Sequence, residues 1–215
     1  MVNDPDLAAI GELINEFLRT ERDKRRVGGS DLPDDLRDRY GARLAGMDAL
    51  LRTVRVVFVP RLPDPVALNE KLEDLGIKTL SFSNGYEAMT FVDTVLLATE
   101  KLGIATFNDI ARAPRSRPDA TLLHELVHVV QYAALGVDGR SAESIGKFTK
   151  WQIPDYLLLL QDPPKIEYEQ ITFEDAARRT ENEYKAGKDP DGVAIAYACM
   201  DAKGIPYKKL ELATV

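Results

Sequence analysis

The sequence of 215 residues contains 28 Lys and Arg against 35 Asp and Glu, which gives a net charge of −7, and 45% of its residues are hydrophobic. This composition is typical of a soluble globular protein with one sizeable core or two small ones. Binding to a nucleic-acid backbone needs a strongly basic face, so we expect no nucleic-acid partner. The basic run RDKRR at 22–26 indicates a solvated helix end.

Cysteine usage and hydropathy bear on the compartment. Cys199 is the single cysteine, so no internal disulfide forms and a reducing compartment is compatible with the chain. The N-terminal stretch MVNDPDLAAIGEL is acidic where a secretion signal is basic, and no apolar run reaches the roughly 20 residues that span a bilayer. We expect a protein without a membrane partner, either cytoplasmic or exported without a conventional signal peptide.

Apolar residues at helical spacing predict two amphipathic helices in residues 1–52, on either side of the break VGGSDLPDD. The residues that carry this spacing are Leu7, Ile10, Ile14, Phe17 and Leu18, then Leu36, Tyr40, Leu44, Met47 and Leu51. We expect a structural role for these helices, with an inhibitory or substrate-binding role as the alternative.

A strand is predicted at 53–60, where TVRVVFVP is β-branched and ends at a proline, and a helix follows at about 65–74, ending at Gly76. The stretch KTLSFSNGYEAMTFVDTVLLAT predicts strands on both sides of a hairpin turn at Asn84 and Gly85. The second of these strands covers 88–98 and is expected to bend at Asp93.

The most regular helix pattern is PDATLLHELVHVVQYAALG, which has a capping Asp119 and ends at Gly136. Prolines 154, 163 and 164 predict short, interrupted helices after it, and two further helices are expected at 172–187 and 191–204. The fold class is therefore α+β, with N-terminal helices, a small mixed or antiparallel sheet and a C-terminal helical part. We divide the chain into an N-terminal helical segment, 1–52, and a domain at 53–215, joined in one compact unit.

Both histidines of the chain lie in TLLHELVHVVQY, at 124 and 128. Residues four apart share one face of a helix, so the two imidazoles can converge on one metal ion. Glu125 sits on the same turn, where it can reach water bound to the ion without itself being a ligand. This is the HExxH arrangement of zinc hydrolases, in which the glutamate is the general base.

The apolar flanks of the motif indicate a buried helix, in which an unpartnered His-Glu-x-x-His set would cost several kcal/mol of desolvation. Metal ligation removes that cost. The sequence therefore predicts a Zn²⁺ site.

Catalytic zinc usually has three protein ligands. No histidine remains, so an HExxHxxGxxH arrangement is excluded, since the position six after His128 is Ala134, and a carboxylate from a later helix is expected as the third ligand. Glu174 is the first choice, because aromatic Phe173 precedes it and small Ala177 lets two helices approach closely; Glu169 is the second choice. The full set of candidates is Glu143, Glu167, Glu169, Glu174, Asp175, Glu181 and Glu183, of which Glu181 and Glu183 lie in a charged run and are expected to be solvated.

The segment HELVHVVQY, with the preceding AMTFVDTVLLAT strand and the later FEDAA helix, resembles the gluzincin zinc metallopeptidases, and within them the small bacterial DUF4157-type group. The likeness covers about residues 53–187, and its specific part is the HExxH motif. It implies a zincin-like domain with zinc held by His124, His128 and Glu174, and Glu125 as general base. It also implies a polypeptide substrate that adds to the strand at 88–98. Many gluzincins place an acidic residue four positions after the ligand glutamate, where this chain has Arg178.

Two roles stay open in the sequence. The oxyanion of a tetrahedral intermediate needs a donor, and the candidates are Tyr168, Tyr184, Tyr197 and Arg178. Gln131 either supports a histidine ligand or satisfies a buried backbone group.

Three other functions are alternatives to the peptidase. They are a zinc hydrolase acting on a small amide or modified peptide, a catalytically idle HExxH-fold regulator, and a helical interaction protein without metal. An intact Glu125 argues against the idle regulator, because metal binding alone has no use for the base. The oligomeric state is not specified by the sequence.

Overall fold

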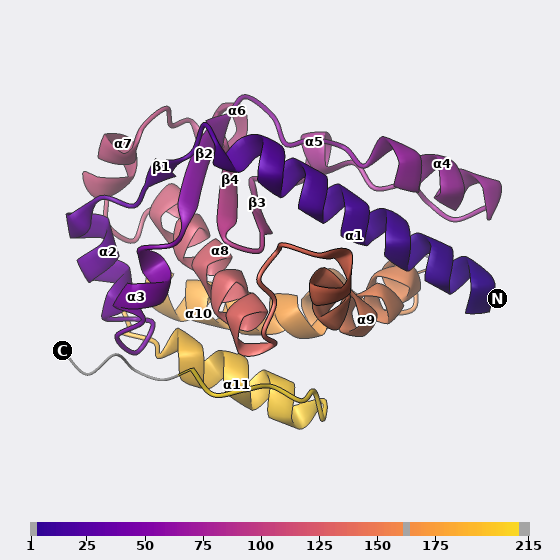
Figure 1. Ribbon diagram of the computed structural model, residues 1–215. Coiled ribbons are helices and arrows are strands. Elements are labelled where there is room, and N and C mark those ends of the chain that lie inside the picture. The colour runs from indigo at the N-terminus through magenta and orange to yellow at the C-terminus, as the bar shows by residue number, and fades with distance from the viewer. Residues whose placement is uncertain (1–3, 161–163, 211–215) are drawn as a thin grey trace.

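The chain, described for residues 4–160 and 164–210 of a computed structural model, has an α+β fold (Figure 1). The predicted fold class is therefore confirmed. Its first half contains α1 (Asp4–Arg26), β1 (Ser30–Asp31), α2 (Asp34–Gly41), α3 (Asp48–Leu51), β2 (Arg55–Val59), α4 (Val66–Asp74), α5 (Phe82–Gly85), β3 (Ala88–Phe91), β4 (Thr94–Ala98) and α6 (Thr99–Leu102). Its second half contains α7 (Phe107–Ala111), α8 (Arg117–Ala134), α9 (Ala142–Leu159), the 3-10 helix η1 (Tyr168–Gln170), α10 (Thr172–Lys185) and α11 (Gly192–Ala202).

The sheet is small and mixed, with the strand order β1-β2-β4-β3. The β2 and β4 strands are parallel, whereas β1 pairs with β2 and β3 with β4 in antiparallel register. Every residue of β4 is buried, as expected for a central strand with both faces covered. The β3 strand therefore forms one edge of the sheet, on the side where it contacts α8.

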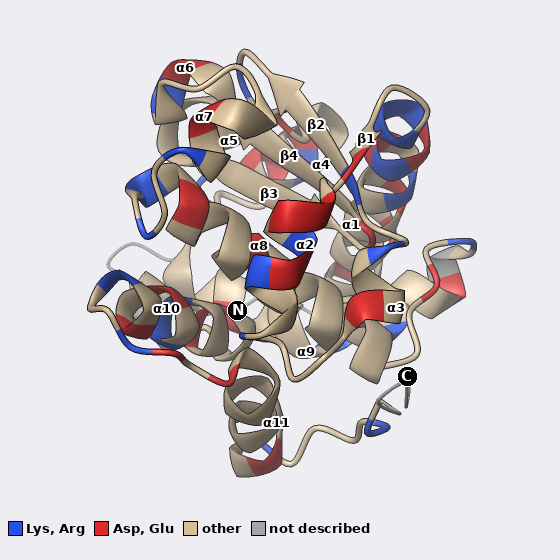
Figure 2. Cartoon of the chain, turned by 90° about the vertical axis from the view of Figure 1, so that its left-hand side faces the viewer, with Lys and Arg blue, Asp and Glu red and all other residues tan. Residues whose placement is uncertain are grey.

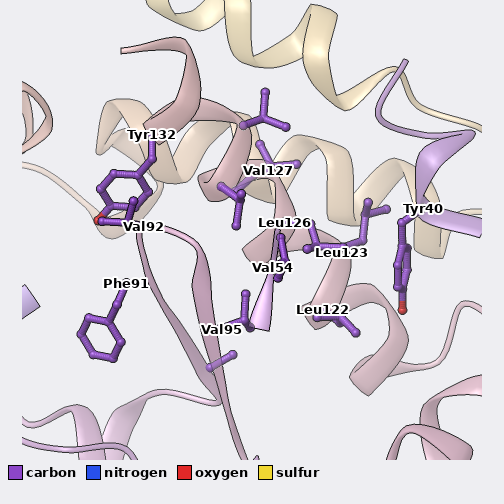
Figure 3. Close-up of a cluster of buried hydrophobic side chains, with 14 of the residues drawn as sticks. Tyr40, Val54, Phe91, Val92, Val95, Leu122, Leu123, Leu126, Val127 and Tyr132 are labelled. Carbon is purple, nitrogen blue, oxygen red and sulfur yellow. The ribbon is translucent and has the colours of Figure 1, made fainter. Parts of the chain in front are cut away.

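The main hydrophobic core lies between α8 and the sheet (Figure 3). Leu122 and Leu126 of α8 are fully buried, as is Val95 of β4. Each such side chain contributes about 1.5–3 kcal/mol when it leaves water. The helix is apolar on nearly all sides, as its sequence predicted, and it crosses the middle of the molecule between the sheet and α10 (Figure 1).

The N-terminus of α8 is fixed by a buried carboxylate. Ser116 is the N-cap residue, so the prediction that Asp119 caps the helix was wrong by three positions. Asp119 is fully buried one turn further on, where its oxygens accept hydrogen bonds from the hydroxyls of Tyr40 and Tyr184, at 2.7 and 2.6 Å, and from Arg39 at 2.7 Å. These bonds connect α2, α8 and α10 at the N-terminal end of α8.

Helix α1 packs against the sheet, α4 and α9, so the segment 1–52 is part of the same packed structure as the rest of the described chain. The run at 22–26 is not simply solvated, which corrects the expectation. Arg22 donates two hydrogen bonds to Asp93, at 2.8 and 2.9 Å, and Arg26 forms an ion pair with the same carboxylate. Since Asp93 lies in the tight turn between β3 and β4, these arginines anchor α1 to the edge of the sheet.

Two further predictions about helices were wrong. The second N-terminal helix is interrupted between α2 and α3, because Ala45 and Gly46 adopt left-handed backbone conformations. Pro154 lies inside α9 rather than ending a helix, since Ile153 and Leu157 are held by packing in a second apolar cluster with α1 and α4. Pro163 lies outside the described residues.

Asn84 and Gly85 do not form a hairpin turn; they end the single-turn helix α5. The preceding residues are held away from the sheet by side-chain hydrogen bonds. Asn69 of α4 bonds both backbone groups of Leu80, and Asp64 accepts from the backbone and hydroxyl of Ser83. The actual hairpin connects β3 and β4 through Val92 and Asp93, where a bend was predicted.

Charged residues of both signs are mixed along α2 and α10 rather than separated into faces of one sign (Figure 2). Among the described helices, none has the length and hydropathy to cross a membrane.

We predict that Asp119→Ala lowers the free energy of unfolding by about 3–5 kcal/mol, because it leaves buried polar partners without their acceptor. Urea denaturation measures the change. Asp38→Ala, at an exposed position of α2, should stay within about 0.5 kcal/mol of the native value. Equal effects of the two substitutions would contradict the role assigned to Asp119.

Candidate metal centre

Helix α8 presents the HExxH residues at its centre, on the side that faces α10 and β3. His128 and Glu125 are buried, and the His124 side chain is 12% exposed. The two imidazoles lie one helical turn apart with their Nε2 atoms 3.2 Å from each other. The predicted convergence of the two histidines is present.

Helix α10 brings Glu174 to the same point. Ala177, one turn after Glu174, is fully buried where α10 packs along α8, in line with the small residue expected at a close approach of two helices. Glu174 Oε2 lies 3.3 Å from His124 Nε2 and 3.5 Å from His128 Nε2. Two nitrogens and one oxygen therefore form a nearly equilateral triangle.

The size of this triangle suits zinc. Ligand atoms bonded at about 2.0–2.1 Å in a tetrahedron lie about 3.3–3.4 Å apart, whereas the three separations here are 3.2, 3.3 and 3.5 Å. Within the described chain, these three residues form the one group whose ligand atoms are close enough to hold a metal ion. His124, His128 and Glu174 are the residues that would hold a zinc ion, as the sequence predicted.

The other ring nitrogen of each histidine has an acceptor. His124 Nδ1 lies 3.1 Å from Glu181 Oε2, and His128 Nδ1 lies 2.8 Å from Gln131 Oε1. Acceptor oxygens require that both Nδ1 atoms carry a proton, so that in the neutral rings both Nε2 lone pairs are directed at the centre. The expectation that Glu181 is solvated was therefore wrong: it faces His124 and is only 18% exposed.

Gln131 resolves a choice that the sequence left open, because it fills both suggested roles. Its Oε1 faces His128, and its Nε2 donates to the backbone oxygen of Phe173 at 3.0 Å. Phe173 directly precedes Glu174, so one amide side chain connects a histidine ligand on α8 with the carboxylate ligand on α10.

The two oxygens of Glu174 have different surroundings. Tyr156 donates to Oε1 at 3.3 Å. Oε2 is buried and, among the described residues, has no hydrogen-bond donor; its polar neighbours are the Nε2 atoms of the two histidines. Three lone pairs thus meet in a buried space, an arrangement that a cation stabilises.

The close approach of these groups also shifts the pKa values of His124 and Glu174. Burial lowers the pKa of His124, but its interactions with the Glu174 and Glu181 carboxylates outweigh burial and raise the pKa from 6.5 to about 10. Burial acts to raise the pKa of Glu174, yet the charge of His128 and the close contacts with both histidines hold it well below its usual range. In the metal-free protein a positive charge is therefore favoured at this position.

Glu125 lies beside the triangle and is held from the edge strand. Thr90 Oγ1 of β3 lies 2.7 Å from Glu125 Oε2 and 3.1 Å from the Glu125 backbone oxygen. Burial raises the pKa of Glu125, and the neighbouring histidines counteract only part of that shift. A carboxylate with a raised pKa is suited to accept and return a proton near neutral pH.

The four proposed oxyanion donors separate into two groups. Tyr168 and Arg178 line the cavity that contains the three ligands. Tyr184 and Tyr197 do not, so their proposed role was wrong: Tyr184 donates to Asp119 at the other end of α8, and the Tyr197 hydroxyl accepts from the backbone of Leu210.

The remaining carboxylates offered as ligands lie elsewhere. Glu143 and Glu167 are exposed, and Asp175 accepts a hydrogen bond from Cys199. Glu169 lies in η1, and its side chain is outside the described residues.

Thr90 and Tyr156 were not among the residues predicted for the site. Thr90 is a polar residue in an otherwise apolar strand, which is a usable signal. Tyr156 lies in α9, and nothing in its spacing connects it to the motif.

Comparison with known protein families, curated proteins and solved structures found no match for this chain.

We predict that Glu174→Ala abolishes stoichiometric zinc binding, whereas Glu169→Ala retains one zinc ion per chain. Elemental analysis of purified protein, with zinc offered during purification, gives the metal content. Loss of zinc in the Glu169 variant instead would contradict the assignment of the third ligand.

Glu181→Gln should weaken zinc affinity by about 10–100-fold, because partners of ligating histidines orient the ring and raise its basicity. Competition with a chromogenic chelator measures the affinity. Glu183→Gln removes a carboxylate from the same helix and should leave the affinity unchanged; a similar loss in both variants would point to a general charge effect.

Proposed function

We propose that this protein is a zinc-dependent hydrolase that cleaves amide bonds in polypeptides, a metallopeptidase of gluzincin type. The observation that carries the proposal is the triangle of His124, His128 and Glu174 atoms at tetrahedral separations, with the buried Glu125 carboxylate beside it. The gluzincin assignment rests on the HExxH motif and on a carboxylate third ligand from a later helix.

The chain's own residues supply the remaining parts of the chemistry. Zinc held by the three ligands would supply Lewis acidity, which acidifies water and polarises a carbonyl group. Glu125 then accepts the proton that the attacking water loses and delivers it to the departing amine. Thr90 keeps the Glu125 carboxylate oriented during both transfers. Tyr168 and Arg178 are the described donors at the cavity that can stabilise the developing oxyanion.

A substrate main chain has a place to bind. The β3 strand is an edge of the sheet, it contacts α8, and its Thr90 touches the general base. An extended peptide added to this edge would lie along the zinc site, with its backbone fixed by strand hydrogen bonds.

The same site would also serve hydrolysis of a small amide or a modified peptide, because the bond and the catalytic groups are the same. A purely regulatory HExxH protein is less well supported, since burial and the Thr90 contact tune a base that metal binding does not require.

We expect that Glu125→Gln keeps its zinc but lowers kcat about a hundred- to ten-thousandfold, the usual contribution of a positioned general base. Turnover of a fluorescence-quenched peptide library by the zinc-loaded chain measures this effect. Glu87→Gln removes another carboxylate at the same cavity and should retain most of the activity. Zinc-loaded protein that cleaves no peptide or amide in the library would refute the proposed function.

A further inference from the structure

A large cavity extends from the candidate metal centre into the apolar part of the protein. Its volume is about 620 Å³, and its lining includes His124, Glu125, His128 and Glu174. A cavity of about 150 Å³ suffices for a benzene ring, and cavities of about 300–1,000 Å³ hold ligands of drug size. The space is therefore much larger than a single amino-acid side chain requires.

The charged residues of this cavity lie on one side of it. All of its charged lining residues come from the segment around β3 and from α8 and α10, near the metal centre. The other end lies between α1, α4 and α9, which run beside one another away from the sheet (Figure 1). There the described lining is mostly aliphatic, including Ile10, Ile14, Leu72, Leu157 and Leu160, and α9 adds the uncharged polar residues Thr149 and Gln152.

The apolar end is elongated along α1. Ile10 and Leu18 both line the cavity and are eight residues apart, which corresponds to about 12 Å along a helix. The cavity therefore has the length of a chain rather than of one compact group.

The walls at this end are helices, whose backbone groups already bond within each helix. A peptide main chain inserted between them would leave its own N–H and C=O groups without partners, which costs several kcal/mol. An aliphatic chain has no such groups and gains free energy from each methylene that it buries.

We propose that this part of the cavity is a binding subsite for a straight aliphatic chain on the substrate, so that the amide cleaved at the metal centre belongs to an acylated peptide or a related N-acyl compound. The assignment to a substrate rests on the proposed function; the capacity of the cavity to bind an aliphatic chain does not. In this arrangement the amide lies at the three ligands and Glu125, and the chain lies between α1, α4 and α9.

Straight-chain alcohols of 4, 6, 8 and 10 carbons test the subsite without catalysis. Their binding to the full-length chain, with and without zinc, can be followed by isothermal titration calorimetry. We expect affinity to rise up to about three- to fourfold per added methylene, in either metal state. Decanol that binds no more tightly than butanol would overturn the proposal.

Variants that fill the cavity test whether the alcohol binds at its aliphatic end. Ile14→Trp and Leu160→Trp place an indole in the aliphatic end and should weaken decanol binding at least about tenfold, by occupying the same volume. Leu158→Trp, at a position of α9 that is 37% exposed, is the matched control and should bind decanol as the native chain does. Unchanged binding in folded Ile14→Trp and Leu160→Trp proteins would overturn the location; if neither variant folds, the chain-length series on the native protein decides.

Hydrolysis separates this inference from the proposed function. With zinc-loaded protein, kcat/KM for peptides N-acylated with 4, 6, 8 and 10 carbons should rise with chain length. Alcohol binding without hydrolysis of any amide would keep the subsite and refute the hydrolase. If kcat/KM does not change with acyl length, or is higher for leucine-rich peptides than for decanoyl peptides, the hydrolase assignment stands and the acyl subsite is refuted.

Discussion

The convergence of three lone pairs at one buried point is the constraint around which this protein is built. Two imidazole nitrogens and a carboxylate oxygen lie 3.2–3.5 Å apart, and no described donor satisfies the oxygen. In a medium of low dielectric constant such an arrangement is unstable unless a positive charge occupies its centre. The raised pKa of His124 and the depressed pKa of Glu174 express the same requirement in the metal-free protein.

Four neighbouring side chains hold the residues of this site in place. Gln131 ties His128 to the start of α10, and Glu181 orients His124 from further along the same helix. Tyr156 of α9 binds the second oxygen of Glu174, and Thr90 of β3 binds Glu125, the proposed general base. These contacts join the candidate metal centre to neighbouring elements, so the packing of α8 against α10 and the sheet also positions the site.

Much of this arrangement could be predicted because its signals are local. Residues four apart on a helix share a face whatever the rest of the fold does, so His124 and His128 were assigned directly, and the small Ala177 indicated where a second helix approaches. The helices α8, α10 and α11 and the strand β2 were predicted from periodicity and terminal glycine or proline.

The rest depended on contacts between distant segments. Glu181 sits in a charged run that indicates a solvated face, and only the packing of α10 turns it toward His124. Tyr184 has a hydroxyl that could act as a catalytic donor, but it donates a hydrogen bond to Asp119, 65 positions earlier in the chain. The Asn84-Gly85 pair has the sequence of a hairpin turn, yet Asn69 and Asp64 bind the preceding residues and prevent strand pairing. The cavity also could not be predicted from the sequence, because its apolar walls come from three helices whose patterns each indicate ordinary core packing.

X-ray absorption spectroscopy of the zinc-reconstituted protein tests the central claim most directly, because it reports the ligands of the ion itself. We predict one zinc ion per chain, bound only by nitrogen and oxygen atoms at about 2.0–2.1 Å, with the scattering signature of two imidazoles. A protein that takes up no stoichiometric zinc, or a spectrum that lacks the two imidazoles, would contradict it.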